Sequence, residues 1–177
     1  MAQYKSYNPN AKLIGRSIIP MIMGMGDRAK PYLERYGLAE VDPDKWYSQQ
    51  DFLSACRDVA NGEGGTMDFV SIGMNIPNMV HLPPELDSVK AILMSMNDAY
   101  HMNQQDDDSG WQVTEVGPGQ FVCVASNPFP HDLDYGVLYG FVRRFRKPGE
   151  RFTVTVDETA PSRAKGDDTS TYIVKLG

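Results

Sequence analysis

The chain has 177 residues, with 17 lysines and arginines against 23 aspartates and glutamates, which gives a formal net charge of −6. This acidic balance argues against a nucleic-acid-binding protein, which needs a basic surface. The sequence has no apolar run of about 18 residues that would predict a transmembrane helix. Cys56 and Cys123 are too few and too far apart for a secreted disulfide framework. We therefore expect a cytoplasmic, globular protein.

The first 102 residues are predicted to be helical. Residues 1–11 are polar and are expected to form a loose tail, which leaves residues 12–177 as a single domain. Apolar residues then recur at a spacing of three and four, which is typical of helices. Pro31 interrupts the first of these and predicts a break around residues 26–30. Four helices are expected: residues 18–36, a second from Asp44 or Ser48 to residue 60, a third over 67–79, and a fourth from Asp87 or Ser88 to residue 102.

The apolar period changes after residue 110. Alternating residues around Gly117-Pro118-Gly119 predict a β-hairpin. A helix over residues 132–147 follows, and residues 152–156 and 172–176 alternate again as two strands. The sequence thus predicts an α+β fold: an N-terminal layer of about four helices, then a four-stranded antiparallel sheet built as hairpin, helix, hairpin.

Few residues indicate catalysis or metal binding. The sequence lacks a G-x-S-x-G elbow, a P-loop, an H-E-x-x-H helix and a C-x-x-C pair, so we do not expect an enzyme. The histidines are about twenty and thirty residues apart, which argues against a shared metal site. His101, near the end of an apolar helix, could ligate haem iron from one side, or it could simply complement the helix dipole. The acidic run 106–108 is interpreted as a solvated loop.

One cationic run stands out in this acidic chain. It contains Arg143, Arg144, Arg146, Lys147 and Arg151. At the end of a helix these charges complement the dipole and form a solvated face. They could also dock an acidic partner or anionic lipid headgroups.

Two late segments carry a family resemblance. The glycine-containing stretch 135–141 is similar to a helix of the vinyl-reductase-type domains, and residues 154–174 resemble the terminal strand–loop–strand of that family. These small-molecule-binding domains share a fold group with haem nitric-oxide-binding domains and some vesicle-tethering subunits. The family commonly carries cysteines in the terminal segment, where this chain has Ser162 and Ser170. The resemblance therefore implies no thiolate metal site. The Tyr-x-Ser-x-Arg motif of the haem branch is also absent.

The resemblance implies a bacterial-type sensory module that binds a small hydrophobic molecule between helices and sheet. Such pockets are mostly apolar with a few polar groups. We expect the lining to come from Met94, Met96, Tyr100, His101, Trp111, Tyr135 and Tyr139. All ten methionines lie in the first 102 residues, so adaptable side chains would come from the helical layer. One alternative is a haem or other tetrapyrrole protein with His101 as axial ligand. Another is a protein-interaction module without a ligand, such as a homodimer.

Overall fold

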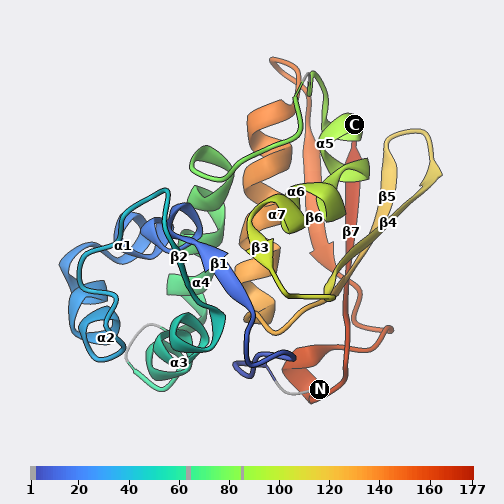
Figure 1. The fold of residues 1–177 in the computed structure, drawn as a ribbon. Coiled ribbons are helices and arrows are strands. Elements are labelled where there is room, and N and C mark those ends of the chain that lie inside the picture. Colours follow the sequence, from blue (N-terminus) through green and yellow to red (C-terminus); the bar gives the residue numbers. More distant parts are fainter. Residues whose placement is uncertain (1–2, 63–64, 85) are drawn as a thin grey trace.

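The N-terminal half forms a layer of helices. The computed structural model describes residues 3–62, 65–84 and 86–177. Three 3₁₀ turns accompany the helices of this layer: Gly15–Ser17 (η1) precedes the first helix, Gly26–Ala29 (η2) joins the first two helices, and Ile76–Asn78 (η3) follows the last. Figure 1 shows the helices grouped on one side of the molecule: α1 (Ile19–Met25), α2 (Lys30–Glu34), α3 (Gln49–Ala60) and α4 (Gly65–Asn75).

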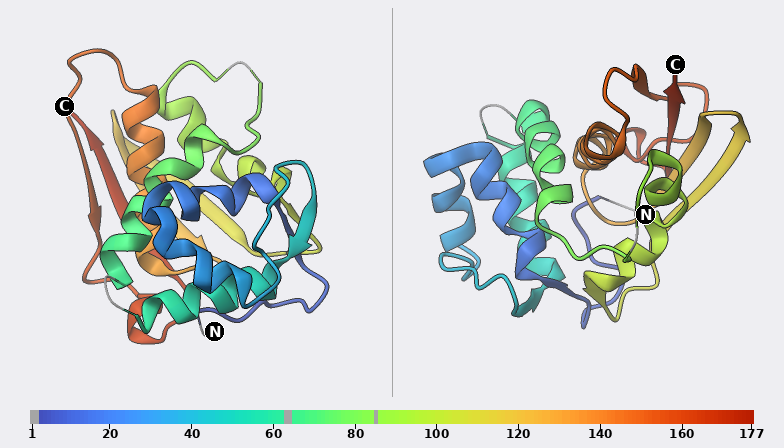
Figure 2. Two further views of the ribbon diagram at one scale, coloured as in Figure 1. Left: turned by 90° about the vertical axis from the view of Figure 1, so that its left-hand side faces the viewer. Right: turned by 90° about the horizontal axis from the view of Figure 1, so that it is seen from above.

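The C-terminal half forms an antiparallel sheet with helices beside it. The four strands are arranged in the order β4-β5-β7-β6, which confirms the predicted sheet and the α+β class. Seen from above in Figure 2, this sheet unit and the helical layer are two adjoining groups. The elements of the unit are α5 (Val89–Met94), α6 (Met96–Met102), β4 (Gly110–Gly117), β5 (Gln120–Ser126), α7 (His131–Phe145), β6 (Phe152–Val156), the 3₁₀ turn η4 (Arg163–Lys165) and β7 (Ser170–Leu176).

Local sequence explains where several helices begin and break. Ser48 and Ser88 cap α3 and α5, because each hydroxyl accepts a hydrogen bond from a backbone N–H in the first turn. Pro31 lies in the first turn of α2, where its missing N–H costs nothing, and the chain before it breaks as predicted. The helix expected over residues 87–102 is instead two short helices that meet at Ser95.

A small second sheet was not predicted. It joins β1 (Lys12–Ile14) to β2 (Trp46–Ser48) on one side and to β3 (Gln104–Gln105) on the other. Trp46, which the helical pattern placed on an apolar helix face, lies in β2 with 37% of its surface exposed. The sheet ties the start of the helical layer to the chain that follows α6.

The described part of the expected tail is packed against both halves. The backbone N–H of Tyr4 donates to the carbonyl of Pro128, and the N–H of His131 donates to the Gln3 side chain. The N–H of Ser6 donates to Gln50 in α3. Residues 3–11 are therefore a strap between α3 and the start of α7, and the expectation of a loose tail is wrong for them.

Helices α4 and α7 join the two halves by a close crossing, which Figure 2 shows side by side. A Cβ atom added to Gly73 would overlap the carbonyl oxygen of Leu133, and one added to Gly136 would overlap that of Val70. Only glycine lets the two backbones approach this closely. The glycines of the 135–141 stretch are therefore packing residues at the interface between the layers.

We expect Gly136→Ala to lower the free energy of unfolding by about 1–3 kcal/mol, because the added methyl group overpacks the crossing. Gly65→Ala is the matched control, since its Cβ would meet no atom closer than 3.4 Å. Urea denaturation measures both. Equal stability of the two variants would show that the crossing does not depend on glycine.

Candidate functional site

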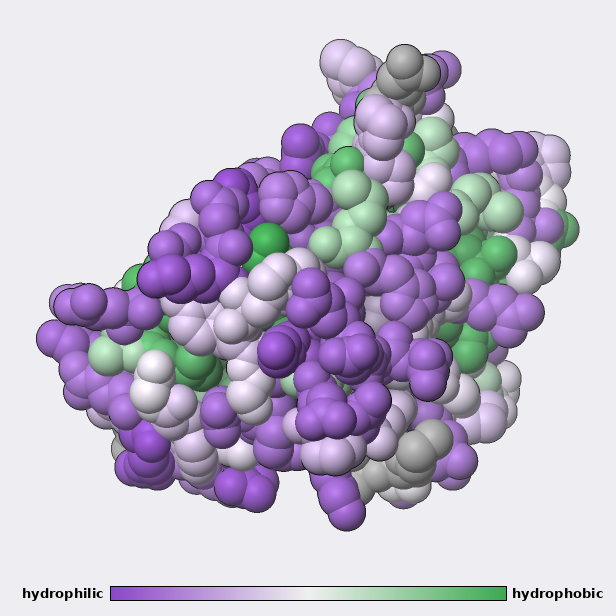
Figure 3. Space-filling view, in the orientation of Figure 1, coloured by the Kyte–Doolittle hydropathy of each residue, from purple (hydrophilic) through white to green (hydrophobic). Residues whose placement is uncertain are grey.

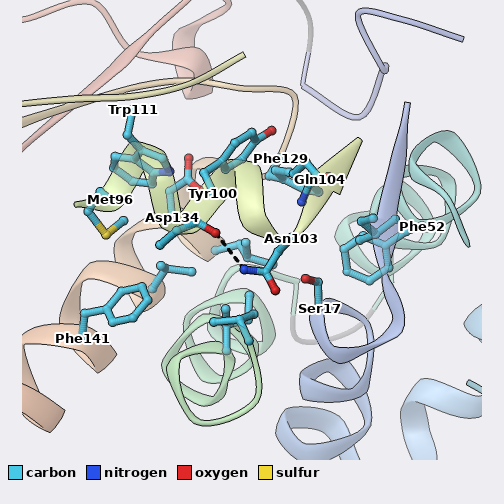
Figure 4. A pocket seen from close by; sticks show the side chains of 16 residues that line it. Ser17, Phe52, Met96, Tyr100, Asn103, Gln104, Trp111, Phe129, Asp134 and Phe141 are labelled. Atoms are coloured by element: carbon cyan, nitrogen blue, oxygen red, sulfur yellow. Dashed lines mark hydrogen bonds between the residues drawn. The ribbon is translucent and has the colours of Figure 1, made fainter. Parts of the chain in front are cut away.

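A small cavity lies between the helical layer and the sheet unit. Its volume is about 80 Å³. Figure 4 looks into it and shows aromatic and aliphatic side chains around a few polar ones. The lining comes from both halves of the chain: Leu13, Ser17, Phe52, Ile76, Val80, Met96, Ala99, Tyr100, Asn103, Gln104, Trp111, Phe129, Leu133, Asp134, Val137 and Phe141.

The structure brings three of the seven expected lining residues to this cavity, namely Met96, Tyr100 and Trp111. The other four lie elsewhere. Met94 and His101 are exposed on α5 and α6. Tyr135 and Tyr139 stack on one another with ring centres 6.5 Å apart, and the Tyr139 ring also packs against the ring of Phe152 in β6.

Asn103 is a buried polar residue of the lining that the sequence did not indicate. Its amide donates to the carbonyls of Ala99 and His81, at 2.7 Å each, and its Oδ1 accepts from the N–H of His81 at 2.9 Å. These bonds hold the chain after η3 against the end of α6. Because all of them are internal, the Asn103 side chain is a structural clamp in the cavity wall.

Tyr100 presents its ring to the cavity and its hydroxyl to a polar network behind it. The hydroxyl donates to Asp107 at 2.7 Å and lies 2.9 Å from the Ser109 hydroxyl. Gln49 of α3 also donates to Asp107. Asp107 is only 7% exposed, so the interpretation of residues 106–108 as a solvated loop is wrong at this position. Burial raises the pKa of Tyr100, and the Asp107 carboxylate raises it further.

Asp134 of α7 is the one charged residue that the described part of the chain places in the lining, and it forms a buried ion pair. Its Oδ2 accepts from the Arg163 guanidinium and from the Asn127 amide. The Arg163 side chain is 0% exposed and also donates to the carbonyl of Phe129 at 2.8 Å. Burial raises the pKa of Asp134, and the attraction and hydrogen bonds from Arg163 oppose the rise. The pair connects η4 to the cavity wall.

Four polar atoms of the lining have no hydrogen-bond partner within the part of the chain that the structure describes. They are Ser17 Oγ, Gln104 Nε2, Asp134 Oδ1 and Trp111 Nε1, and all four are accessible to solvent, because the one enclosed side-chain N or O atom without a partner in these residues is the Tyr7 hydroxyl. These atoms can bond to water, so they carry no penalty for an unmet hydrogen bond. An apolar cavity with a few polar atoms that have no protein partner is suited to a guest with a polar end.

The described residues offer no metal site of three or more His, Cys, Asp or Glu side chains. His81 and His101 are exposed, whereas His131 is buried and stacks on Tyr172 at 5.2 Å. Both cysteines are buried and free, and burial raises the pKa of the Cys123 thiol to about 12. Within these residues no helix is long and apolar enough to cross a membrane.

Comparison with known proteins gives one consistent result. No family model matches the chain, and no curated protein matches it. Among solved structures, an H-NOX protein from S. oneidensis in the Fe(II)NO ligation state superposes with a TM-score of 0.67 at 16% identity, over 93% of this chain and 99% of that one. An oxygen-binding H-NOX domain related to soluble guanylate cyclases has a TM-score of 0.66 at 14% identity, over 92% of each chain.

A third H-NOX structure, from work on heme distortion in that family, has a TM-score of 0.62 at 16% identity over 92% of this chain and 90% of that one. The chain has the H-NOX fold. This agrees with the fold group that the sequence resemblance implied, whereas the vinyl-reductase-type family itself is not confirmed. At these identities the superpositions establish the fold alone.

We expect Arg163→Met to lower the free energy of unfolding by about 3–5 kcal/mol, because it leaves Asp134 buried without its partner. Arg16→Met is the matched control: it breaks the solvent-exposed pair with Asp44, at 2.6 Å, and should cost less than about 1 kcal/mol. Urea denaturation of both variants at pH 7 tests this. Similar losses for the two arginines would contradict the structural role of the buried pair.

Proposed function

We propose that the protein is a ligand-binding sensory domain, and that its ligand is a small, mostly apolar molecule held in the cavity between the helical layer and the sheet unit. The observation that carries this proposal is the apolar cavity, whose few polar atoms without a protein partner among the described residues are open to solvent. An engineered apolar cavity of about 150 Å³ binds benzene or xenon. A volume of about 80 Å³ therefore suits a molecule smaller than benzene, such as a short alcohol.

The comparisons favour the tetrapyrrole alternative over this reading, since the similar structures are described with iron, nitric oxide, oxygen or heme. The tetrapyrrole alternative requires residues in this chain that could hold haem. An axial ligand is commonly His, Cys, Met or Tyr. Among the described residues the lining contains no His or Cys, and His101 lies outside it on the surface. The Tyr100 hydroxyl is bound to Asp107 and Ser109. Met96 remains, but Met serves as an axial ligand together with His.

The charge of the cavity wall and the size of the cavity also argue against haem. The propionates of haem are anionic, and no Lys or Arg is found in the cavity wall within the part of the chain that the structure describes. Its single charged residue is Asp134, a carboxyl group. Pockets for drug-sized ligands measure about 300–1,000 Å³, well above the 80 Å³ found in this chain. The residues present therefore do not fit haem, and we propose a function that does not depend on it.

The third alternative, a protein-interaction module without a ligand, has less support. Figure 3 shows one face of the molecule as mostly hydrophilic, with small separate apolar areas. Large apolar patches mark protein interfaces. Homodimerisation stays a prediction, and light scattering at high protein concentration would detect it.

A titration with ethanol tests the small ligand. We expect shifts in the NMR signals of the Ser17 and Gln104 backbone amides, and a loss of these shifts in Ala99→Val, which fills the cavity. Ala91→Val is the matched control, because Ala91 lies on α5 outside the lining. Shifts that survive in Ala99→Val would contradict binding in this cavity.

A visible spectrum after mixing with haem tests the alternative on the same protein. We expect no Soret band of a ligated haem in the purified chain. A band that appears and then changes in His101→Ala would establish the tetrapyrrole reading and overturn ours.

A further inference from the structure

The charge of the molecule is unevenly distributed. Although the net charge is −6, six of the 17 cationic residues gather around the C-terminal end of α7. The rest of the molecule has only 11 lysines and arginines, whereas the whole chain has 23 aspartates and glutamates. We call these six the basic end: Arg143, Arg144, Arg146, Lys147, Arg151 and Lys175. Figure 1 shows the end of α7 and the C-terminus at the same end of the fold.

Two hollows of about 500 Å³ each flank this helix end. The first lies between α4, η3 and α7 and is lined by two arginines and by short polar and small residues: Arg143, Arg144, Asn75, Asn78, Ser71, Met74 and Gly140. The second lies between α7 and the β6–β7 edge and contains Arg146, Arg151 and Lys175 beside Tyr139 and Phe152.

The cations of the basic end are not neutralised by carboxylates of the described residues. Within the described part of the chain none of the six forms an ion pair. Two guanidinium groups are held in place by carbonyl groups: Arg144 donates to Pro77, and Arg146 donates to Glu150 at 2.8 Å. Arg146 also lies over the Phe152 ring, 5.3 Å from its centre. Side chains that are already ordered lose less entropy on binding.

The helix dipole accounts for only part of this cluster. Arg143 and Arg144 are in the last turn of α7, where a cation is favoured. Arg146 is the residue that follows the helix, and Arg151 and Lys175 come from the chain beyond it. Like charges brought together in this way repel one another. An anionic partner would remove this repulsion.

We propose that the basic end docks an acidic segment of a partner protein, whose Asp or Glu carboxylates enter the two hollows. Arginine presents a planar fork of N–H groups that binds a carboxylate through two parallel hydrogen bonds. Concave sites walled by arginines, asparagine amides and aromatic rings suit separate side chains, whereas a lipid surface is flat. This inference does not rest on the cavity or its ligand.

Fluorescence anisotropy with a labelled deca-glutamate peptide tests the proposal on the full chain. We expect binding that weakens as salt is raised, because counterions screen the charges. Arg143→Ala/Arg151→Ala, with one substitution in each hollow, should weaken binding about tenfold. Neither side chain makes a hydrogen bond or ion pair within the described residues, so both should leave the fold intact.

Lys5→Ala/Lys12→Ala is the matched control, since it removes the same charge from exposed residues elsewhere. We expect it to change peptide affinity less than twofold. Equal weakening by both double variants, or no binding of the peptide at low salt, overturns the proposal. Vesicles containing phosphatidylserine are the second arm. Vesicle binding that the peptide does not displace would assign the basic end to a membrane surface and overturn docking of a protein.

Discussion

The close contact of α4 with α7 is the constraint on which the rest of the molecule depends. Three glycines make it possible, because a Cβ on Gly73, Gly136 or Gly140 would collide with the backbone of the opposite helix. The contact sets the distance between the helical layer and the sheet unit. One face of α7 lines the cavity. It carries Leu133, Val137 and Phe141, which are four residues apart and therefore lie on the same side of the helix. The cavity is thus the space left beside a crossing that cannot be widened without separating the layers.

The buried pair of Arg163 and Asp134 holds the other end of the same helix. Arg163 comes from a 3₁₀ turn between the last two strands, and Asp134 from the first turn of α7. Since Asp134 also lines the cavity, one hydrogen-bonded ion pair connects the 3₁₀ turn η4 to the cavity wall. Its cost in desolvation is offset by carbonyl and amide partners that surround both groups.

Local patterns predicted the elements that local forces build. The four long strands follow from alternation over five or more residues, and Ser48, Pro31 and Gly117-Pro118-Gly119 mark boundaries by their own chemistry. The small sheet was missed because β1, β2 and β3 have two or three residues each, too few to show a period. The break at Ser95 was missed because the apolar spacing continues across it.

The candidate site was harder to predict because no window of sequence contains it. Its lining draws on residues from Leu13 to Phe141, so only the fold brings them together. Met96, Tyr100 and Trp111 could be expected from their apolar or aromatic character. Asn103 and Asp134 could not, because their partners are 22 and 29 residues away in the sequence and lie beside them only in the folded chain.

The fold and the ligand depend on different residues, so a fold shared at 14–16% identity does not fix the ligand. The layers are fixed by glycine contacts, apolar burial and strand pairing, and many sequences satisfy these conditions. A tetrapyrrole would add specific demands: an axial ligand within the pocket, cations for the propionates and room for the ring. In this chain the Tyr100 hydroxyl donates to Asp107, the cavity wall contains the acidic residue Asp134, and the cavity measures about 80 Å³. The chemistry of the ligand is therefore determined by these residues and not by the fold.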